Sequence, residues 1–256
     1  MTGFRPVAGL SRAERAQVGA LVAGHPVFAL YWDAALDAAA GDRSRSVRLE
    51  PEGAVLGIDF DGLSVYTPVG SVGDAALLSL TADPRPLELH LTLDQTERLR
   101  PACRDRLALE DGLRFYARPL ADLPEPDPAC RRMGPGELKP LRRFYAAHYP
   151  ATVFSAWMLE LPFVAIVEDG RPVAAGGVLA RAGSRAMIGN FLVDPARRGE
   201  GLAGRIVSGL LAALQTEGVA TALLATNDLN PAACRVYERA GFALIERRVQ
   251  LDLRAA

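Results

Sequence analysis

The feature that most constrains the fold of this chain is a glycine-rich turn, VDPARRGEGLAG, which begins at Val193. The stretch before it, RAMIGNFLV, is mostly apolar and predicts a strand. After it, Leu, Ile and Val recur at steps of three to five residues over 202–214, which predicts an amphipathic helix that Gly218 ends. A strand that enters a helix through such a turn leaves the first amides of the helix unpaired.

The turn is a candidate anion site. Gly199 and Gly201 carry no side chain that would keep a phosphate away from the unpaired amides. The two arginines at 197–198 add positive charge, whereas Glu200 has to point away from any bound anion. The alternative is that the glycines make a tight turn and nothing more. No G-K-[ST] follows them, which excludes a nucleotide P-loop.

The first 120 residues mix predicted helices with predicted strands, so this part is α+β. Ser11 and Glu14 form a capping box that opens a helix to about Ala23, and Pro26 begins a second helix that ends at Gly41. Further strands are expected at 46–50, 54–60, 63–69, 87–93 and 112–120. Helices are expected at 74–82 and 94–109, the second broken or started near Pro101.

The stretch ADLPEPDPAC, which starts at Ala121, contains three prolines and three acidic residues and predicts a linker. We therefore expect an N-terminal α+β domain over residues 1–125 and a second domain over 130–256.

The second half predicts a helix, three antiparallel strands, a helix, a strand, a helix and a final strand. Asp169-Gly170 marks a hairpin turn between the first two strands. Asn230, Pro231 and Gly241 have the positions of a cap, a first helical residue and a terminator around the last helix.

The turn resembles the acyl-CoA signature of the GNAT acetyltransferases, R-x-x-G-x-G/A, with Arg198, Gly201 and Ala203 at its fixed positions. In that superfamily an Asn begins the next helix and a Tyr follows seven residues later, as Asn230 and Tyr237 do here. The resemblance implies the GNAT acyl-CoA N-acyltransferase fold, α+β with a mixed, splayed central sheet flanked by helices. Whether the N-terminal domain is a degenerate half of the same fold is left open.

The resemblance also implies acetyl-CoA as co-substrate, with no metal. Its pantetheine arm would pair with the strand before the turn, and its pyrophosphate would meet the amides after it. The residues implied to bind it are Phe191, Leu192, Val193, Arg198, Gly199, Glu200, Gly201, Leu202, Ala203, Gly204, Asn230 and Tyr237.

Direct attack of an amine on the thioester needs a stabilised oxyanion and a proton for the departing thiolate. The resemblance implies that Tyr237 supplies this proton. The strand before the turn carries Gly189 and Asn190 where better-known members have a glutamate, so the general base stays unassigned. Asn190 is the second catalytic candidate, as a residue that orders water, and His148 and Glu160 are further candidates for the base.

Composition limits the partners. A net charge of −1 and a pI near 6.3 give no general attraction for nucleic acid or anionic membranes. Three widely spaced cysteines form no zinc pattern, and the sequence has neither a signal peptide nor a run of eighteen apolar residues, which predicts a cytoplasmic protein. We expect transfer of an acetyl group to a primary amine of a small molecule or peptide by a monomer or homodimer. Transfer of a longer acyl chain and a non-catalytic acyl-CoA sensor are the alternatives.

Overall fold

The computed structural model describes residues 3–37, 45–60, 63–121, 123, 125, 127–149, 152 and 154–256. Contacts divide the chain into two compact units. The first unit comprises Met1–Phe115, Thr226–Leu229 and Glu246–Ala256, and the second comprises Tyr116–Ala225 and Asn230–Ile245. The units are therefore not two consecutive stretches of chain. A division after residue 125 stays a prediction, because these contacts do not establish which segment folds alone.

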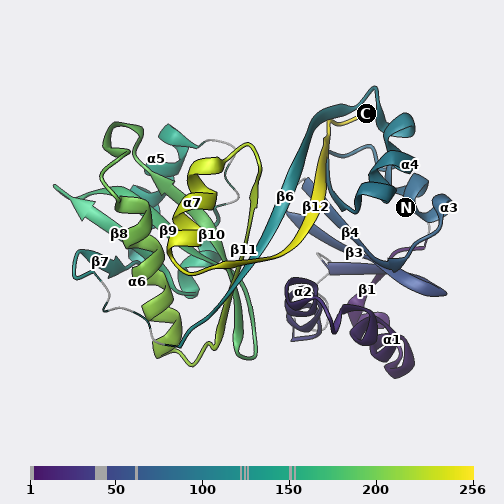
Figure 1. Cartoon of the computed structure of the whole chain (residues 1–256), viewed down its shortest axis with the longest axis horizontal. Coiled ribbons are helices and arrows are strands. Elements are labelled where there is room, and N and C mark those ends of the chain that lie inside the picture. The colour runs from purple at the N-terminus through teal and green to yellow at the C-terminus, as the bar shows by residue number, and fades with distance from the viewer. Residues whose placement is uncertain are drawn as a thin grey trace. The chain divides into compact units, whose positions relative to one another are not determined.

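The first unit contains helices and strands in alternating groups, which Figure 1 traces along the chain. Its elements are β1 Arg5–Pro6, η1 Val7–Gly9, α1 Arg12–Val22, α2 Pro26–Asp37, β2 Arg45–Glu50, β3 Glu52–Phe60, β4 Leu63–Ser71, α3 Asp74–Leu80, β5 Leu87–Leu91, α4 Leu93–Cys103 and β6 Leu107–Pro119. The last of these strands continues into the second unit.

Local sequence explains where these elements begin. Ser11 accepts the Glu14 amide and the Glu14 carboxylate accepts the Ser11 amide, which confirms the capping box of α1. The predicted end of α2 at Gly41 lies outside the described residues. The helix predicted over 94–109 is wrong in its last part, because α4 ends at Cys103 and the chain pairs into the sheet as β6 from Leu107.

The sheet of the first unit has the order β1-β2-β3-β4-β5-β12, where β12 is the last strand of the chain, Ala243–Leu253. The pairs β1–β2, β2–β3 and β3–β4 are antiparallel, whereas β5 is parallel to β4 and antiparallel to β12. One core cluster joins α3 and α4 to this sheet through apolar side chains that include Leu77, Leu89 and Leu99.

The elements of the second unit are β7 Cys130–Arg132, η2 Pro135–Glu137, α5 Leu138–His148, η3 Ala156–Glu160, β8 Phe163–Glu168, β9 Arg171–Ala182, β10 Arg185–Val193, η4 Pro195–Arg197, α6 Leu202–Thr216, β11 Thr221–Asn227 and α7 Pro231–Arg239, followed by the start of β12. They follow the predicted order from α5 onward, and the short strand β7 before it was not predicted. The sheet order is β6-β11-β10-β9-β8-β7, with β7 to β10 antiparallel and β10 parallel to β11. The predicted α+β class with a mixed sheet is confirmed.

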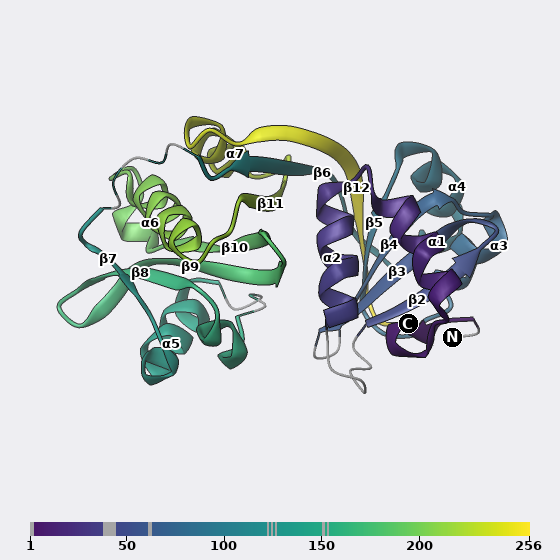
Figure 2. The ribbon, with the colours of Figure 1, turned by 90° about the horizontal axis from the view of Figure 1, so that it is seen from below.

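Helices cover both faces of the second unit's sheet, with α6 on one face and α5 on the other (Figure 2). The α6 face holds a core that includes Ile206, Leu210 and Tyr237. The α5 face holds a separate core that includes Tyr145, Met158 and Leu192. Because successive strand residues point to opposite faces, β10 contributes to both cores.

Strands β10 and β11 pair over a short stretch only. Their register joins Arg185–Met187 to Thr221–Leu223, and the paired stretch stops there although β10 continues to Val193. The two strands are therefore unpaired with each other over the part of β10 that leads into the glycine turn.

None of the described helices is both long and apolar enough to cross a membrane. Cys103, Cys130 and Cys234 are free, and burial raises the pKa of the Cys130 thiol to about 11.

Glycines in β9 make room for aromatic rings. A Cβ on Gly177 would lie 2.0 Å from the Phe163 ring, whereas a Cβ on Gly136 would meet nothing within 4 Å. We expect Gly177→Ala to lower the free energy of unfolding by about 1 to 3 kcal/mol through overpacking, measured by chemical denaturation. Gly136→Ala is the matched control and should change it by less than about 0.5 kcal/mol; equal effects of the two substitutions would contradict this account.

Candidate active site

The glycine turn joins β10 to α6. The Asp194 carboxylate accepts the Ala196 amide at 2.9 Å and caps the short helix η4. The chain then passes through Gly199 and Gly201 with φ of 89° and 76°, and Gly201 is the N-cap of α6. Glycine is needed at both positions because residues with a Cβ rarely adopt this left-handed conformation.

The amides of the turn have no acceptor. The first backbone bond of α6 runs from the Arg205 amide to the Gly201 carbonyl at 3.2 Å. In the described part of the chain, no group accepts a hydrogen bond from the N–H groups of residues 199–204. These donors lie at the positive end of the α6 dipole, so an anion is favoured there.

Arg197 and Arg198 differ in what they contact. Arg197 bonds both oxygens of Glu200 at 2.7 Å and also pairs with Glu168 at 2.5 Å. These bonds hold the pKa of both carboxyls below their usual range. Arg198 is exposed and has no ion-pair partner among the described residues. The negative charge of Glu200 is therefore compensated by Arg197, while the positive charge of Arg198 is available to a bound anion.

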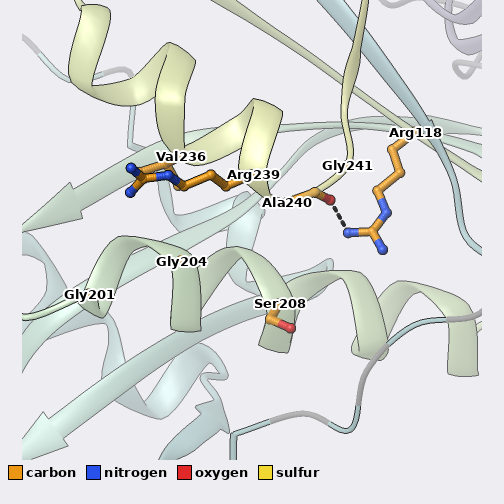
Figure 3. A pocket seen from close by; sticks show the side chains of 8 residues that line it. All are labelled: Arg118, Gly201, Gly204, Ser208, Val236, Arg239, Ala240 and Gly241. Carbon is orange, nitrogen blue, oxygen red and sulfur yellow. Dashed lines mark hydrogen bonds between the residues drawn. The ribbon is translucent and has the colours of Figure 1, made fainter.

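A groove of about 480 Å³ runs beside the turn between α6 and α7 (Figure 3). Gly201, Gly204 and Ser208 line it from one face of α6, as their spacing of three and four residues requires. The facing residues are Val236, Arg239, Ala240 and Gly241 at the end of α7, with Arg118 from β6.

Two guanidinium groups lie at this groove without a carboxylate partner among the described residues. Arg118 donates to the Ala240 carbonyl, the bond drawn in Figure 3, and burial lowers the pKa of its guanidinium. Arg239 extends over the first turns of α6 in the same view. The groove is therefore lined by backbone donors at one side and by unneutralised cations at the other.

Gly204 lies in the groove wall, although neither backbone conformation nor packing requires glycine there. Its φ is not positive, and an added Cβ would meet nothing within 4 Å. Glycine inside a helix costs about 0.5 to 1 kcal/mol relative to alanine. The residue leaves space beside the unpaired amides that no side chain of the protein uses.

Helix α7 presents the predicted pair Asn230 and Tyr237. The Asn230 side chain accepts the Ala233 amide at 3.2 Å, so the residue is the N-cap of the helix. Tyr237 is 7% exposed, and its ring centroid lies 5.8 Å from that of Phe191 on β10. The structure thus brings together Phe191 and Tyr237, which the sequence separates by 46 residues.

Burial raises the pKa of Tyr237, and the neighbouring Cys234 raises it further. The phenol is therefore protonated at neutral pH and can donate a proton but not accept one. Among the described residues its hydroxyl has no hydrogen-bond partner.

Strand β10 carries a bulge at Asn190. Gly189 pairs with Gly177 and Leu192 pairs with Ala175, so two residues of β10 lie opposite the single residue Gly176. Asn190 has a φ of 53°, and asparagine tolerates this left-handed conformation better than most residues.

Gly176 also makes room for the Phe191 side chain. A Cβ on Gly176 would lie 2.3 Å from the Phe191 ring. The bulge thereby turns Phe191 toward the α6 face, where it packs against the core beside Tyr237.

The other base candidates lie in separate surroundings. His148 ends α5, with Nε2 3.9 Å from the Asp194 carboxylate. It lines a second groove of about 1010 Å³ between α5 and the β8–β9 turn. Glu160 is exposed at the end of η3. No three His, Cys, Asp or Glu side chains of the described residues are grouped so that they could hold a metal ion.

Solved structures share this architecture. A Drosophila protein is 12% identical with a TM-score of 0.70, and the match covers 98% of each chain. A GCN5-related N-acetyltransferase-like protein from Streptococcus suis is 14% identical with a TM-score of 0.67, covering 95% of this chain and all of the other. A GCN5-related N-acetyltransferase from Sphaerobacter thermophilus is 12% identical with a TM-score of 0.64, covering 98% and 96%. At these identities the likeness shows the fold alone.

Comparison of the sequence with family profiles identifies the family. No curated protein matches the chain. The profile of the acetyltransferase (GNAT) family, however, matches residues 128–242, a segment that includes β10, the glycine turn, α6 and α7. This segment is a GNAT acetyltransferase domain.

Three glycines of the turn and the start of α6 also have the G-x-G-x-x-G spacing of dinucleotide-binding turns. They are Gly199, Gly201 and Gly204. In the dinucleotide fold the strands beside the turn form a parallel sheet. Here β10 is antiparallel to β9, and β9 to β8. The strand directions thus distinguish the two folds where the glycine spacing does not.

Several residues of the candidate site could not be predicted from the sequence. Arg118 precedes the linker in sequence, and nothing in its neighbourhood points to the groove. Arg239 lies two residues after Tyr237, so helix geometry alone could have placed it near the groove. The Tyr145 hydroxyl donates to the Asn190 carbonyl at 2.5 Å, a contact that no sequence motif predicts.

We expect Gly204→Ala to raise the free energy of unfolding by about 0.5 to 1 kcal/mol, because alanine is the better helix former and has room here. Chemical denaturation measures the change. A loss of stability would mean that this glycine is required by packing.

Proposed function

We propose that the protein is an acyl-CoA-dependent N-acyltransferase that moves an acetyl group from acetyl-CoA to a primary amine. The observation that carries the proposal is the row of unpaired amides at residues 199–204, which opens on an unfilled groove inside an acetyltransferase-family domain. A pyrophosphate is the group of acyl-CoA that matches such donors.

In this proposal the turn binds the pyrophosphate through the amides of Gly199, Glu200, Gly201, Leu202, Ala203 and Gly204, with charge from Arg198. The unneutralised guanidinium groups of Arg118 and Arg239 favour the phosphates further. The pantetheine arm pairs with the backbone of Phe191, Leu192 and Val193. Pairing of β10 with β11 ends after Met187, and this supports the later part of β10 as the site of the pantetheine arm.

The chemistry then takes place beside Tyr237. The neutral amine nitrogen attacks the thioester carbon and forms a C–N bond, and the carbonyl oxygen takes up negative charge. Collapse of this intermediate breaks the C–S bond, and the Tyr237 hydroxyl gives its proton to the sulfur. The proton that the attacking nitrogen loses returns the phenolate to the phenol, directly or through solvent. A free thiol has a pKa of about 8.5, so coenzyme A leaves as the thiol at neutral pH. Asn230 contacts the coenzyme arm from the start of the same helix.

Asn190 takes part through the backbone in this proposal. Its side-chain amide donates to the Met158 sulfur at 3.2 Å, and its side-chain oxygen accepts from the Thr152 hydroxyl at 3.4 Å. Both ends of the side chain are thus engaged, which favours a role in shaping β10 over the ordering of a catalytic water.

Gly204→Glu tests the coenzyme site, because it adds bulk and like charge beside the amides at a position where a side chain fits without strain. We expect the affinity for acetyl-CoA, measured by calorimetry, to fall at least tenfold, about 1.4 kcal/mol. Gly204→Gln supplies the bulk without the charge and should weaken binding less. Unchanged affinity in both folded variants would exclude this turn as the phosphate site.

Tyr237→Phe tests the proton donor. We expect kcat to fall by about 100-fold or more with little change in acetyl-CoA affinity, because the proton is needed only as the thiolate leaves. Since burial raises the pKa of Tyr237, the wild-type kcat should show no loss up to about pH 10 from its ionisation. Equal kcat values for the two proteins would remove Tyr237 from the mechanism, and coenzyme binding without turnover on any amine would favour a sensor.

A further inference from the structure

The bulge residue Asn190 is held by three side chains that reach it from the α5 side of the sheet. Tyr145 of α5 donates its hydroxyl to the Asn190 carbonyl at 2.5 Å. Thr152 and Met158 engage the two ends of the Asn190 side chain at 3.4 and 3.2 Å. A residue other than glycine with positive φ is strained and persists only where its surroundings fix it.

Tyr145 is the most firmly fixed of the three. It is 1% exposed, and its ring stacks on Phe154 with centroids 4.8 Å apart and planes 18° apart. Burial raises the pKa of its phenol, so the hydroxyl stays a donor at every working pH. The donor of the hydrogen bond to the Asn190 carbonyl is therefore held in a fixed position.

The orientation of the bulge decides where the backbone N–H groups of β10 point. A bulge leaves a residue out of the strand ladder, and here Asn190 and Phe191 share one opposite residue on β9. An N–H freed in this way is the kind of donor that stabilises the oxyanion of acyl transfer. Rotation of the Asn190 peptide would redirect that donor.

We propose that Tyr145 is a positioning residue for acyl transfer, because its bond to the Asn190 carbonyl fixes the β10 bulge so that a backbone N–H polarises the thioester carbonyl. The inference rests on the proposed function. Tyr145 touches neither the thioester nor the amine in it and acts through the backbone of Asn190.

Tyr145→Phe removes the hydroxyl and keeps the ring. We expect kcat to fall at least tenfold while the KM for acetyl-CoA changes less than twofold, because the loss concerns the transition state. The 13C shift of the carbonyl in bound [1-13C]acetyl-CoA, recorded without an amine, should move toward the value of free acetyl-CoA. This signal reports polarisation of the carbonyl directly and does not depend on turnover.

Tyr66→Phe is the matched control. Tyr66 is also buried, and its hydroxyl bonds to Asp83 at 3.3 Å in the first unit. Both variants should be less stable than the wild type in chemical denaturation, and Tyr66→Phe at least as much as Tyr145→Phe, because the Tyr66 hydroxyl also accepts from Arg85 at 3.4 Å. Tyr66→Phe should leave kcat and the carbonyl shift unchanged.

Asn190→Gly provides a second check, since it removes the contacts of Thr152 and Met158 and leaves the Tyr145 bond to the backbone carbonyl in place. If Tyr145 acts by fixing the bulge, its substitution should reduce kcat at least threefold more in the Asn190→Gly background than in the wild type. Equal reductions in both backgrounds would contradict the proposed route.

The outcomes separate the two proposals. Wild-type protein that fails to bind acetyl-CoA would overturn the proposed function and this inference with it. Normal wild-type binding and turnover, with an unchanged carbonyl shift and kcat in Tyr145→Phe, would overturn this inference alone.

Discussion

The early end of pairing between β10 and β11 is the constraint on which the candidate site depends. Paired strands satisfy each other's backbone groups, so inside a sheet a ligand can pair with the backbone only where two strands part. In the second unit they part after Met187 and Leu223, and each strand continues for several residues. The chain then enters α6 through glycines whose amides are also unpaired. Two sources of unused backbone donors thus follow one another along a single segment.

Strand β10 makes different contacts on the two faces of the sheet. On the α6 face, Phe191 and Tyr237 bring the strand and α7 together. On the α5 face, Tyr145, Thr152 and Met158 hold Asn190. Any strand has side chains on both faces, and the bulge changes which residues of β10 lie on each face after Gly189, because the extra residue shifts the alternation of side chains.

The first unit repeats the order of elements, with β4, α3, β5 and α4 in the places of β10, α6, β11 and α7. There too the parallel pair is short, from Ser64–Tyr66 to Leu87–Leu89. Beyond it, however, the buried guanidinium of Arg248 bonds the carbonyls of Pro68 and His90 and lies 4.6 Å from the Phe28 ring centroid. In the first unit, the Arg248 side chain thus bonds backbone carbonyls just beyond the paired stretch of β4 and β5. In the second unit, no side chain of the described residues bonds carbonyls of both β10 and β11 where these strands separate.

The helices and longer strands of the second half, and the open turn before α6, follow from local sequence. Gly199, Gly201 and the amphipathic pattern over 202–214 require an open turn and a helix, because these depend on local backbone conformation and periodicity. The same local signals placed Asn230 as a cap and Tyr237 seven residues later. They failed at residues 104–109, where pairing in the sheet outweighed helical propensity.

Which distant residues meet at the site depends on how whole strands and helices pack. The return of β12 to the first unit, the contribution of Arg118 to the α6–α7 groove and the bond from Tyr145 to Asn190 all join segments far apart in the chain. No local pattern encodes such contacts, because they arise from the register and packing of whole strands and helices. For the same reason the positive φ of Asn190 could not be read from its neighbours: the bulge is fixed by β9 on one side and by α5 and η3 on the other.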